Sequence, residues 1–153
     1  MPVRVSVQRG ADSSAPTRAQ FLRWIRAAVA GRRQDASLTV RVVDAEEGAA
    51  LNHQWRRKRG ATNVLSFPVP DAPPAMPDLL GDIVICAPVV HAEALAQGKS
   101  AEAHWAHLVV HGTLHLLGYD HLRAGEARVM ESLERDILFR LGYPDPYEVI
   151  NPS

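Results

Sequence analysis

The sequence predicts a single α+β domain in which a mixed sheet of roughly four strands packs with about five helices. Short apolar runs with the period-two alternation of strands are interleaved with longer stretches in which apolar residues recur every three or four positions, as in helices. A chain of 153 residues can build one hydrophobic core and is short for two. We therefore expect residues 1–153 to form one domain.

Strands and helices alternate in the first half of the chain. Residues 3–7 alternate valine with polar residues, and the runs at 37–43 and 64–67 are also strand-like. Thr17 and Gln20 have the spacing of a capping box and begin a helix whose apolar stripe ends near residue 31, and Asp44 begins a second helix. The proline-rich residues 68–77 predict a stiff connection within the domain.

The second half is mainly helical after one more strand at 81–86. A short helix is expected over 88–97, and Ser100 can cap the next helix, at about 101–117. This helix has apolar residues nearly all round, which predicts that it is the buried central helix. A covering helix over 125–141 and a turn-rich tail over 142–153 complete the chain.

Composition limits the possible classes of protein. Lysine plus arginine equal aspartate plus glutamate, 17 each, so a nucleic-acid site must be a local patch. The only cysteine, Cys86, excludes an internal disulfide and lies in an apolar run, as a small buried residue would. No apolar run reaches 18 residues and the N-terminus has no leader pattern, so we expect a cytoplasmic protein with neither a membrane span nor a cleaved signal.

The motif with the clearest chemistry ends the predicted central helix, where His111 and His115 are four residues apart. On an α-helix this spacing puts both rings on one side, about 6 Å apart along the axis. Gly118 can take the left-handed conformation that ends a helix, and the resulting turn would bring His121 toward the same point. Three neutral imidazoles with one open position are typical of catalytic zinc. We therefore predict that His111, His115 and His121 bind one zinc ion.

Three neutral ligands leave the charge of the ion uncancelled, which favours an anionic substrate such as a phosphate ester. The alternative is that these histidines only pack or titrate on a helix face. The spacing is also that of the metzincin proteases, whose general base is the glutamate directly after the first histidine. This chain has Gly112 there, so peptide hydrolysis would lack its proton acceptor.

Other residues could support the motif without binding the ion. His104 and His107 continue the row of histidines, but His107 and His115 lie about 12 Å apart along a helix axis, too far to share one zinc ion. We expect His104 and His107 to pack in the core or to hydrogen-bond to a ligand ring. Asp120, next to His121, either orients a ligand ring or is an ordinary turn carboxylate.

A basic run, Arg56-Arg57-Lys58-Arg59, ends the second predicted helix. It can be a solvated helix end whose cations complement the helix dipole. The strand at 64–67 follows so closely that the basic run could instead lie beside a site at the edge of the sheet. Cations beside a metal ion require an anion between them, so on this second reading Arg56, Arg57, Lys58 and Arg59 contact an anionic substrate.

These motifs resemble the bacterial YbeY endoribonucleases, a family of rRNA maturation factors. The resemblance covers about residues 38–147, and its segments are HGTLHLLGYDH at 111–121, TNVLSFP at 62–68, GDI at 81–83 and AHWAH at 103–107. It implies a single-strand-specific, metal-dependent endoribonuclease that acts in 16S rRNA 3′-end maturation, late 30S assembly and ribosome quality control. The three histidines match the family's zinc ligands, and Arg56 best matches its functionally important arginine. The implied partners are RNA, the small ribosomal subunit with its proteins, and assembly GTPases.

The residues and the resemblance lead to one mechanistic hypothesis. Zinc would polarise a phosphate oxygen or activate a water molecule, while Arg56 clamps the phosphate and stabilises charge in the transition state. Attack by the 2′-hydroxyl of the RNA would reduce the need for a protein base. Two other functions stay open: a zinc-stabilised ribosome assembly factor that docks with little nuclease activity, and a metalloprotease, which Gly112 disfavours.

Overall fold

The computed structural model describes residues 3–9, 15–56, 62–69, 72–119 and 124–147. Its sheet has the strand order β1-β2-β4-β3, in which β1 (Val3–Arg9), β2 (Ala36–Val43) and β4 (Leu79–Cys86) are parallel. Strand β3 (Val64–Pro68) runs antiparallel to β4 and forms one edge of the sheet. The predicted mixed, four-stranded sheet is therefore confirmed.

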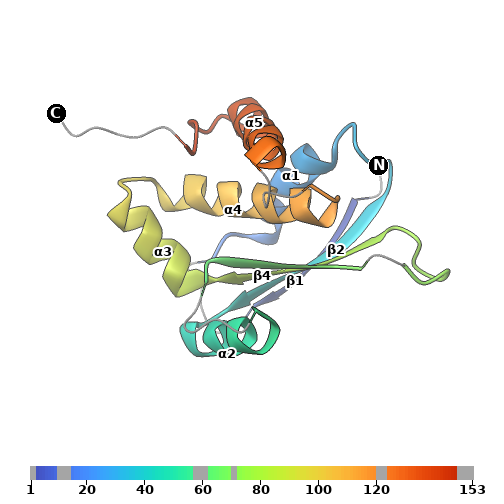
Figure 1. Ribbon diagram of the computed structural model, residues 1–153, viewed down its shortest axis with the longest axis horizontal. Helices are drawn as coiled ribbons and strands as arrows, with labels where there is room; N and C mark the ends of the chain where they lie inside the picture. Colours follow the sequence, from blue (N-terminus) through green and yellow to red (C-terminus); the bar gives the residue numbers. More distant parts are fainter. Residues whose placement is uncertain (1–2, 10–14, 57–61, 70–71, 120–123, 148–153) are drawn as a thin grey trace.

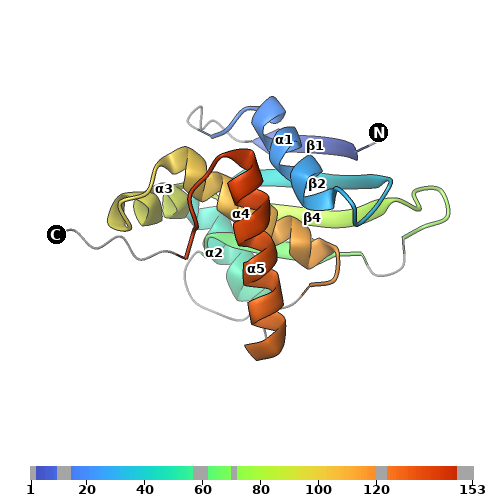
Figure 2. The same cartoon turned by 90° about the horizontal axis from the view of Figure 1, so that it is seen from above.

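The helices in the described residues cover both faces of this sheet. Helices α1 (Arg18–Val29), α4 (Ala101–Leu116) and α5 (Ala124–Leu141) lie on one side, and α2 (Ala45–Arg56) lies on the other (Figure 1). Helix α3 (Ala87–Ala96) follows β4 without a break. Seen from above, α5 crosses α4, and α1 lies beside α4 (Figure 2). Helix α4 is thus between the sheet and α5, which confirms the prediction of a buried central helix.

The main core fills the space between the sheet, α1 and α4. Phe21 packs edge-on against Trp24 of its own helix and against Trp105 of α4, with both pairs of ring centroids 6.0 Å apart. Edge-to-face packing of this kind adds to the gain from burying such large side chains. A smaller cluster under α2 consists of Val43, Leu65, Val84 and Cys86. Cys86 is buried there, as predicted.

All three predicted helix caps are present. The backbone N–H of Gln20 donates to the Thr17 hydroxyl, and the Gln20 side chain accepts from the backbone N–H of Thr17, which completes the capping box. Ser100 accepts from the N–H of Ala103 at the start of α4. Asp44 accepts from the N–H of Glu47 at the start of α2. These short-range bonds explain why the starts of these helices can be read from the sequence.

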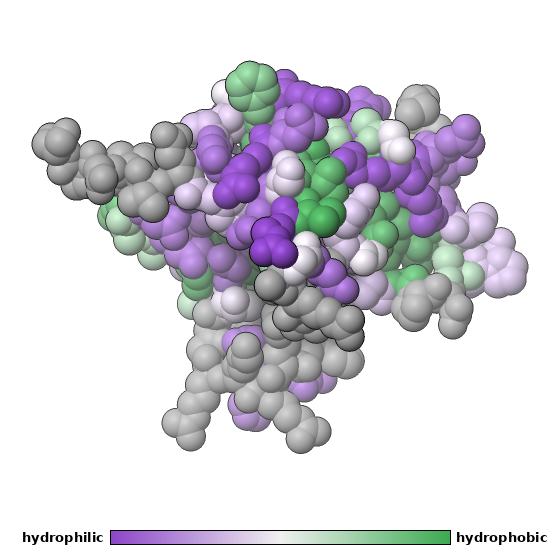
Figure 3. Space-filling model, turned by 45° about the horizontal axis from the view of Figure 1, so that its top comes forward, coloured by the Kyte–Doolittle hydropathy of each residue, from purple (hydrophilic) through white to green (hydrophobic). Residues whose placement is uncertain are grey.

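The outer face over α5 and α1 is mostly hydrophilic, and apolar side chains reach the surface in separate small groups (Figure 3). Phe139 and Leu95 are the most exposed of the large apolar side chains in the described ranges. None of the described helices is long and apolar enough to cross a membrane.

Candidate metal centre

His111 and His115 lie together near the C-terminal end of α4, with ring centroids 4.9 Å apart. The helix then ends in the predicted turn, because Gly118 has a φ of 105° and its N–H donates to the carbonyl of His115. The N–H of Tyr119 donates to the carbonyl of Leu114 and closes the turn. Two imidazoles on one helix face, followed by a turn back, are the start of the predicted three-histidine arrangement.

The third expected ligand, His121, and the neighbouring Asp120 lie outside the described residues. Within the ranges that the structure describes, no three His, Cys, Asp or Glu side chains are placed to hold a metal ion. The described donors fit zinc in their chemistry, because neutral imidazole nitrogens are among its usual ligands. The zinc site at His111, His115 and His121 therefore stays a prediction.

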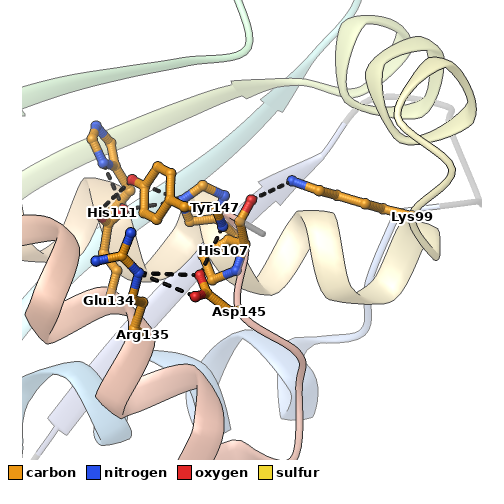
Figure 4. A network of polar contacts seen from close by, with 8 residues as sticks. Lys99, His107, His111, Glu134, Arg135, Asp145 and Tyr147 are labelled. Carbon is orange, nitrogen blue, oxygen red and sulfur yellow. Dashed lines mark hydrogen bonds and ion pairs between the residues drawn. The ribbon is translucent and has the colours of Figure 1, made fainter. Parts of the chain in front are cut away.

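A buried carboxylate supports one of these histidines from the next helix. Glu134 of α5 is 1% exposed, and its Oε1 lies 2.9 Å from Nδ1 of His111 and 3.0 Å from Nε2 of His107 (Figure 4). Its Oε2 accepts a hydrogen bond of 2.7 Å from the hydroxyl of Tyr147. Both carboxylate oxygens thus have partners, as a buried charge requires.

Glu134 is ionised despite its burial. Burial by itself raises the pKa of this carboxyl, but its hydrogen bonds with His107 and His111 and its electrostatic attraction to these groups outweigh that effect and lower the pKa to about 2. The pKa of Tyr147 is raised, first by burial and then by its bond to the Glu134 carboxylate. At neutral pH the pair is therefore a carboxylate that accepts and a phenol that donates.

The segment after α5 holds Tyr147 against this carboxylate. Lys99 donates to the carbonyl of Pro146 at 2.7 Å, and the Arg135 guanidinium contacts Asp145 at 3.2 Å (Figure 4). The N–H of Tyr147 donates to the same Asp145 side chain. The described part of the turn-rich tail is thus held by Lys99, just before α4, and by Arg135 of α5, and the Tyr147 hydroxyl lies 3.3 Å from Nε2 of His107 on α4.

The other two histidines of the row have different partners. His104 is 4% exposed, and its Nε2 lies 3.0 Å from Oε1 of Glu93 on α3. Asn63, just before β3, donates to the same carboxylate oxygen, so this contact joins α3 and α4 to the edge strand. His107 is linked to His111 through Glu134. His104 is therefore part of the packed core, whereas the ring of His107 shares the carboxylate of Glu134 with the predicted ligand His111.

Sequence reasoning missed Glu134 and Tyr147. The signal for Glu134 was present, because it lies four residues after Met130 and three before Ile137 on the buried stripe of α5. A lone carboxylate on an apolar helix face needs a partner in the core. Tyr147 had no comparable signal, since it lies in a segment without periodicity.

Gly112, which stands where metzincins have their glutamate, faces the sheet. A Cβ atom at this position would lie 3.1 Å from Cγ2 of Ile83 and 3.3 Å from the Ser66 hydroxyl. Ser66 also donates to the carbonyl of Gly112 at 3.3 Å. A side chain here would point toward β3 and β4, and Ile83 or Ser66 would have to shift by a few tenths of an ångström to admit even its Cβ atom.

The basic run lies mostly outside the described residues. Arg56 is the last residue of α2, but its side chain is not among those described, and Arg57, Lys58 and Arg59 lie wholly outside. The RNA contacts predicted for these four residues stay a prediction. A separate cavity of about 340 Å³ lies at the Gly118 turn and is lined partly by Arg32 and Arg33. Among the described residues, neither a histidine nor a carboxylate lines this cavity.

The family model and the curated relatives that match this chain carry the same description. The family model described as Endoribonuclease YbeY matches residues 8–142. The chain is 56% identical over 147 residues to the endoribonuclease YbeY of Pseudomonas savastanoi pv. phaseolicola. The matched residues are 95% of this chain and 88% of the relative. It is 53% identical over 153 residues to that of Stutzerimonas stutzeri, with 99% and 95% covered. The solution structure of TM1509 from Thermotoga maritima has the same fold, with a TM-score of 0.61 at 23% identity over 95% of this chain and 99% of that one.

Proposed function

The chain belongs to the YbeY endoribonuclease family, and from this premise we propose that it cleaves single-stranded RNA with one zinc ion held by His111, His115 and His121. Membership makes the protein an endoribonuclease, a hydrolase that cuts RNA internally. We place its activity in rRNA processing in the cytoplasm, at 16S rRNA 3′-end maturation, late 30S assembly and ribosome quality control. RNA, the small subunit with its proteins, and assembly GTPases are the corresponding partners.

The observation that carries this proposal is the pair of imidazoles on α4. His111 and His115 have ring centroids 4.9 Å apart, and the helix that carries them ends in the turn at Gly118, three residues before His121 in the sequence. A zinc ion held there would supply Lewis acidity at a phosphate oxygen or at a water molecule. The carboxylate of Glu134 holds one ring, and Arg56 would donate two parallel hydrogen bonds to the scissile phosphate.

The geometry of Gly112 argues against the protease alternative. A metalloprotease of the metzincin kind needs a carboxylate at this position to take a proton from water. The space beyond the Gly112 Cα is filled by Ile83 and Ser66. Cleavage of RNA can instead use the 2′-hydroxyl of the substrate, which needs no glutamate at 112. Products that end in a 2′,3′-cyclic phosphate would identify that nucleophile, and a free 3′-hydroxyl would exclude it.

The proposal is tested with purified protein to which zinc has been restored. The substrate is one labelled RNA, single-stranded or annealed to its complement, and bound zinc is counted by metal analysis. His115→Ala is expected to lose both zinc and cleavage, whereas His53→Ala, an exposed histidine on α2, should keep both. Arg56→Ala should keep zinc and cleave about 10²-fold more slowly, and Arg4→Ala on the outer strand is its matched control.

Three results would contradict parts of this proposal. Cleavage by His115→Ala at the wild-type rate would point to a contaminating nuclease and remove the zinc mechanism. Wild-type protein that binds zinc and small subunits but leaves RNA intact would favour the docking factor. Unchanged turnover of Arg56→Ala would remove this arginine from the reaction.

A further inference from the structure

We propose that Glu134 is a positioning residue that decides which nitrogen of His111 faces the metal and that bars His107 from the site. The inference deepens the proposed function, because it concerns the same zinc ligands. It rests on the contacts of a single buried carboxylate, which joins α5 to the histidine row of α4.

One oxygen of Glu134 contacts two different rings. Its Oε1 lies 2.9 Å from Nδ1 of His111 and 3.0 Å from Nε2 of His107, so it meets the two rings on chemically different nitrogens (Figure 4). The other oxygen is taken by Tyr147, whose hydroxyl donates to Oε2 at 2.7 Å. Three donors thus converge on one carboxylate that is 1% exposed.

A carboxylate only accepts hydrogen bonds, so each neutral ring must bring its proton to this oxygen. His111 is therefore protonated on Nδ1 and has its lone pair on Nε2. His107 is protonated on Nε2 and has its lone pair on Nδ1. That Nδ1 atom is buried and has no hydrogen-bond partner among the described residues. The lone pair of His107 is consequently enclosed in the protein and is not accessible to a metal ion from solvent.

The contact with Glu134 matters because the His111 ring without it would not favour the tautomer that has its proton on Nδ1. A free histidine side chain in water favours the proton on Nε2, which would leave the lone pair on Nδ1, the nitrogen that faces Glu134. The buried carboxylate reverses the preference and makes Nε2 a better donor to a metal ion, as carboxylates behind zinc-bound histidines generally do. The same contact therefore orients the ring of one histidine and excludes its neighbour.

The first test reads the tautomers directly in metal-free protein. Imidazole ¹⁵N NMR at neutral pH should show His111 protonated on Nδ1 and His107 on Nε2, with signals assigned by the spectra of His111→Asn and His107→Asn. In Glu134→Gln the His111 signal should shift to a mixture of tautomers, because the side chain loses its negative charge and its amide can turn the NH2 group, which only donates, toward the rings. Wild-type His111 protonated on Nε2 would overturn the proposal.

The second test measures zinc affinity by competition with a chelator. Glu134→Gln should bind zinc about 10- to 100-fold more weakly than the wild type. Glu93→Gln is the matched control, because Glu93 makes the same kind of contact, 3.0 Å, with His104 two turns earlier on α4. Its zinc affinity should equal that of the wild type, and circular dichroism checks that both variants are folded.

The outcomes distinguish this inference from the proposed function. An equal loss of zinc affinity in both variants, or none in Glu134→Gln, would overturn the role of Glu134. Wild-type protein that binds no zinc would overturn the proposed function, and the tautomer of its His111 would still decide the role of Glu134. If Glu134→Gln does not fold, the wild-type spectrum remains the decisive measurement.

Discussion

Replacing Gly112 with alanine tests why this helix lacks the metzincin glutamate. The added methyl group would lie 3.1 Å from Cγ2 and 3.3 Å from Cδ1 of Ile83, and 3.3 Å from the Ser66 hydroxyl. Carbon atoms in contact normally lie about 3.5 to 4.0 Å apart. Ile83 is fully buried in β4, so the helix and the sheet must separate by a few tenths of an ångström to admit the methyl group.

Two opposing effects set the size of the change in stability. Alanine is favoured over glycine within a helix by about 1 kcal/mol. Overpacking of a filled core costs about 1 to 3 kcal/mol, and three short contacts put this site in the upper half of that range. We therefore expect Gly112→Ala to lower the free energy of unfolding by about 1 to 2 kcal/mol, or the melting temperature by about 2 to 8 °C for a domain of this size.

Urea unfolding of both the variant and a matched control measures this balance. In Gly125→Ala, near the start of α5, the new methyl group meets no atom within 4 Å, so only the helix preference acts and stability should stay equal or rise by up to about 1 kcal/mol. Ile83→Val removes one of the two carbon contacts and should recover part of the loss in Gly112→Ala. Equal gains in stability at positions 112 and 125 would refute the idea that close packing excludes a side chain at 112.

Two further predictions concern stability away from the histidine pair. Gly81→Ala should destabilise the protein by about 3 kcal/mol or more, because the new Cβ atom would clash with the carbonyl of Phe67 and the backbone φ is 140°. In the control Gly98→Ala the φ is 65° but the space around the Cβ atom is open, so the cost should be about 1 to 2 kcal/mol. Burial lowers the pKa of His104 despite its bond to Glu93, so the free energy of unfolding should fall as the pH drops below the ordinary histidine value of about 6.5. Urea titrations at pH 7.5 and 5.5 should show a smaller fall in His104→Gln, and an equal fall would contradict the role of this histidine.

The sign of the pH effect follows from the neutral state of the His104 ring. A folded-state pKa below the unfolded value means that the unfolded chain binds the proton more readily. The stabilisation from a neutral, buried ring is present above the unfolded pKa and is lost as the pH falls through the folded pKa. Glu134, with a pKa of about 2 against an ordinary 4.5, loses its contribution only in a lower window, between pH 4.5 and 2.

Most of the fold could be predicted because its signals are local. The caps at Thr17, Asp44 and Ser100 join atoms three residues apart, and the strand and helix periods repeat within a few residues. The mixed sheet also follows from the order of the elements, since parallel neighbours need a connection long enough to cross the sheet. The turn at Gly118 could also be predicted from a local signal, because it depends on the conformation of one residue.

The support of the site could not be predicted in the same way. The contact between Glu134 and His111 joins residues 23 apart on different helices, and Tyr147 reaches back across a segment without a repeating pattern. Helical spacing places four histidines in one row but does not say which ring nitrogen each one uses. That choice depends on the crossing of α5 over α4, which no local signal specifies.

Two carboxylates divide the histidine row of α4 into different roles. Glu93 engages Nε2 of His104 and Glu134 engages Nε2 of His107, so both rings have their Nδ1 atoms enclosed in the protein. Glu134 engages His111 through Nδ1 instead, and the Nε2 lone pair of this ring is directed away from the carboxylate. Repetition of histidine along the helix therefore does not make four equivalent donors. The acceptors on α3 and α5 thus favour the C-terminal end of α4 for the proposed zinc site, and at this end the helix closes in the Gly118 turn and Gly112 lies against the sheet.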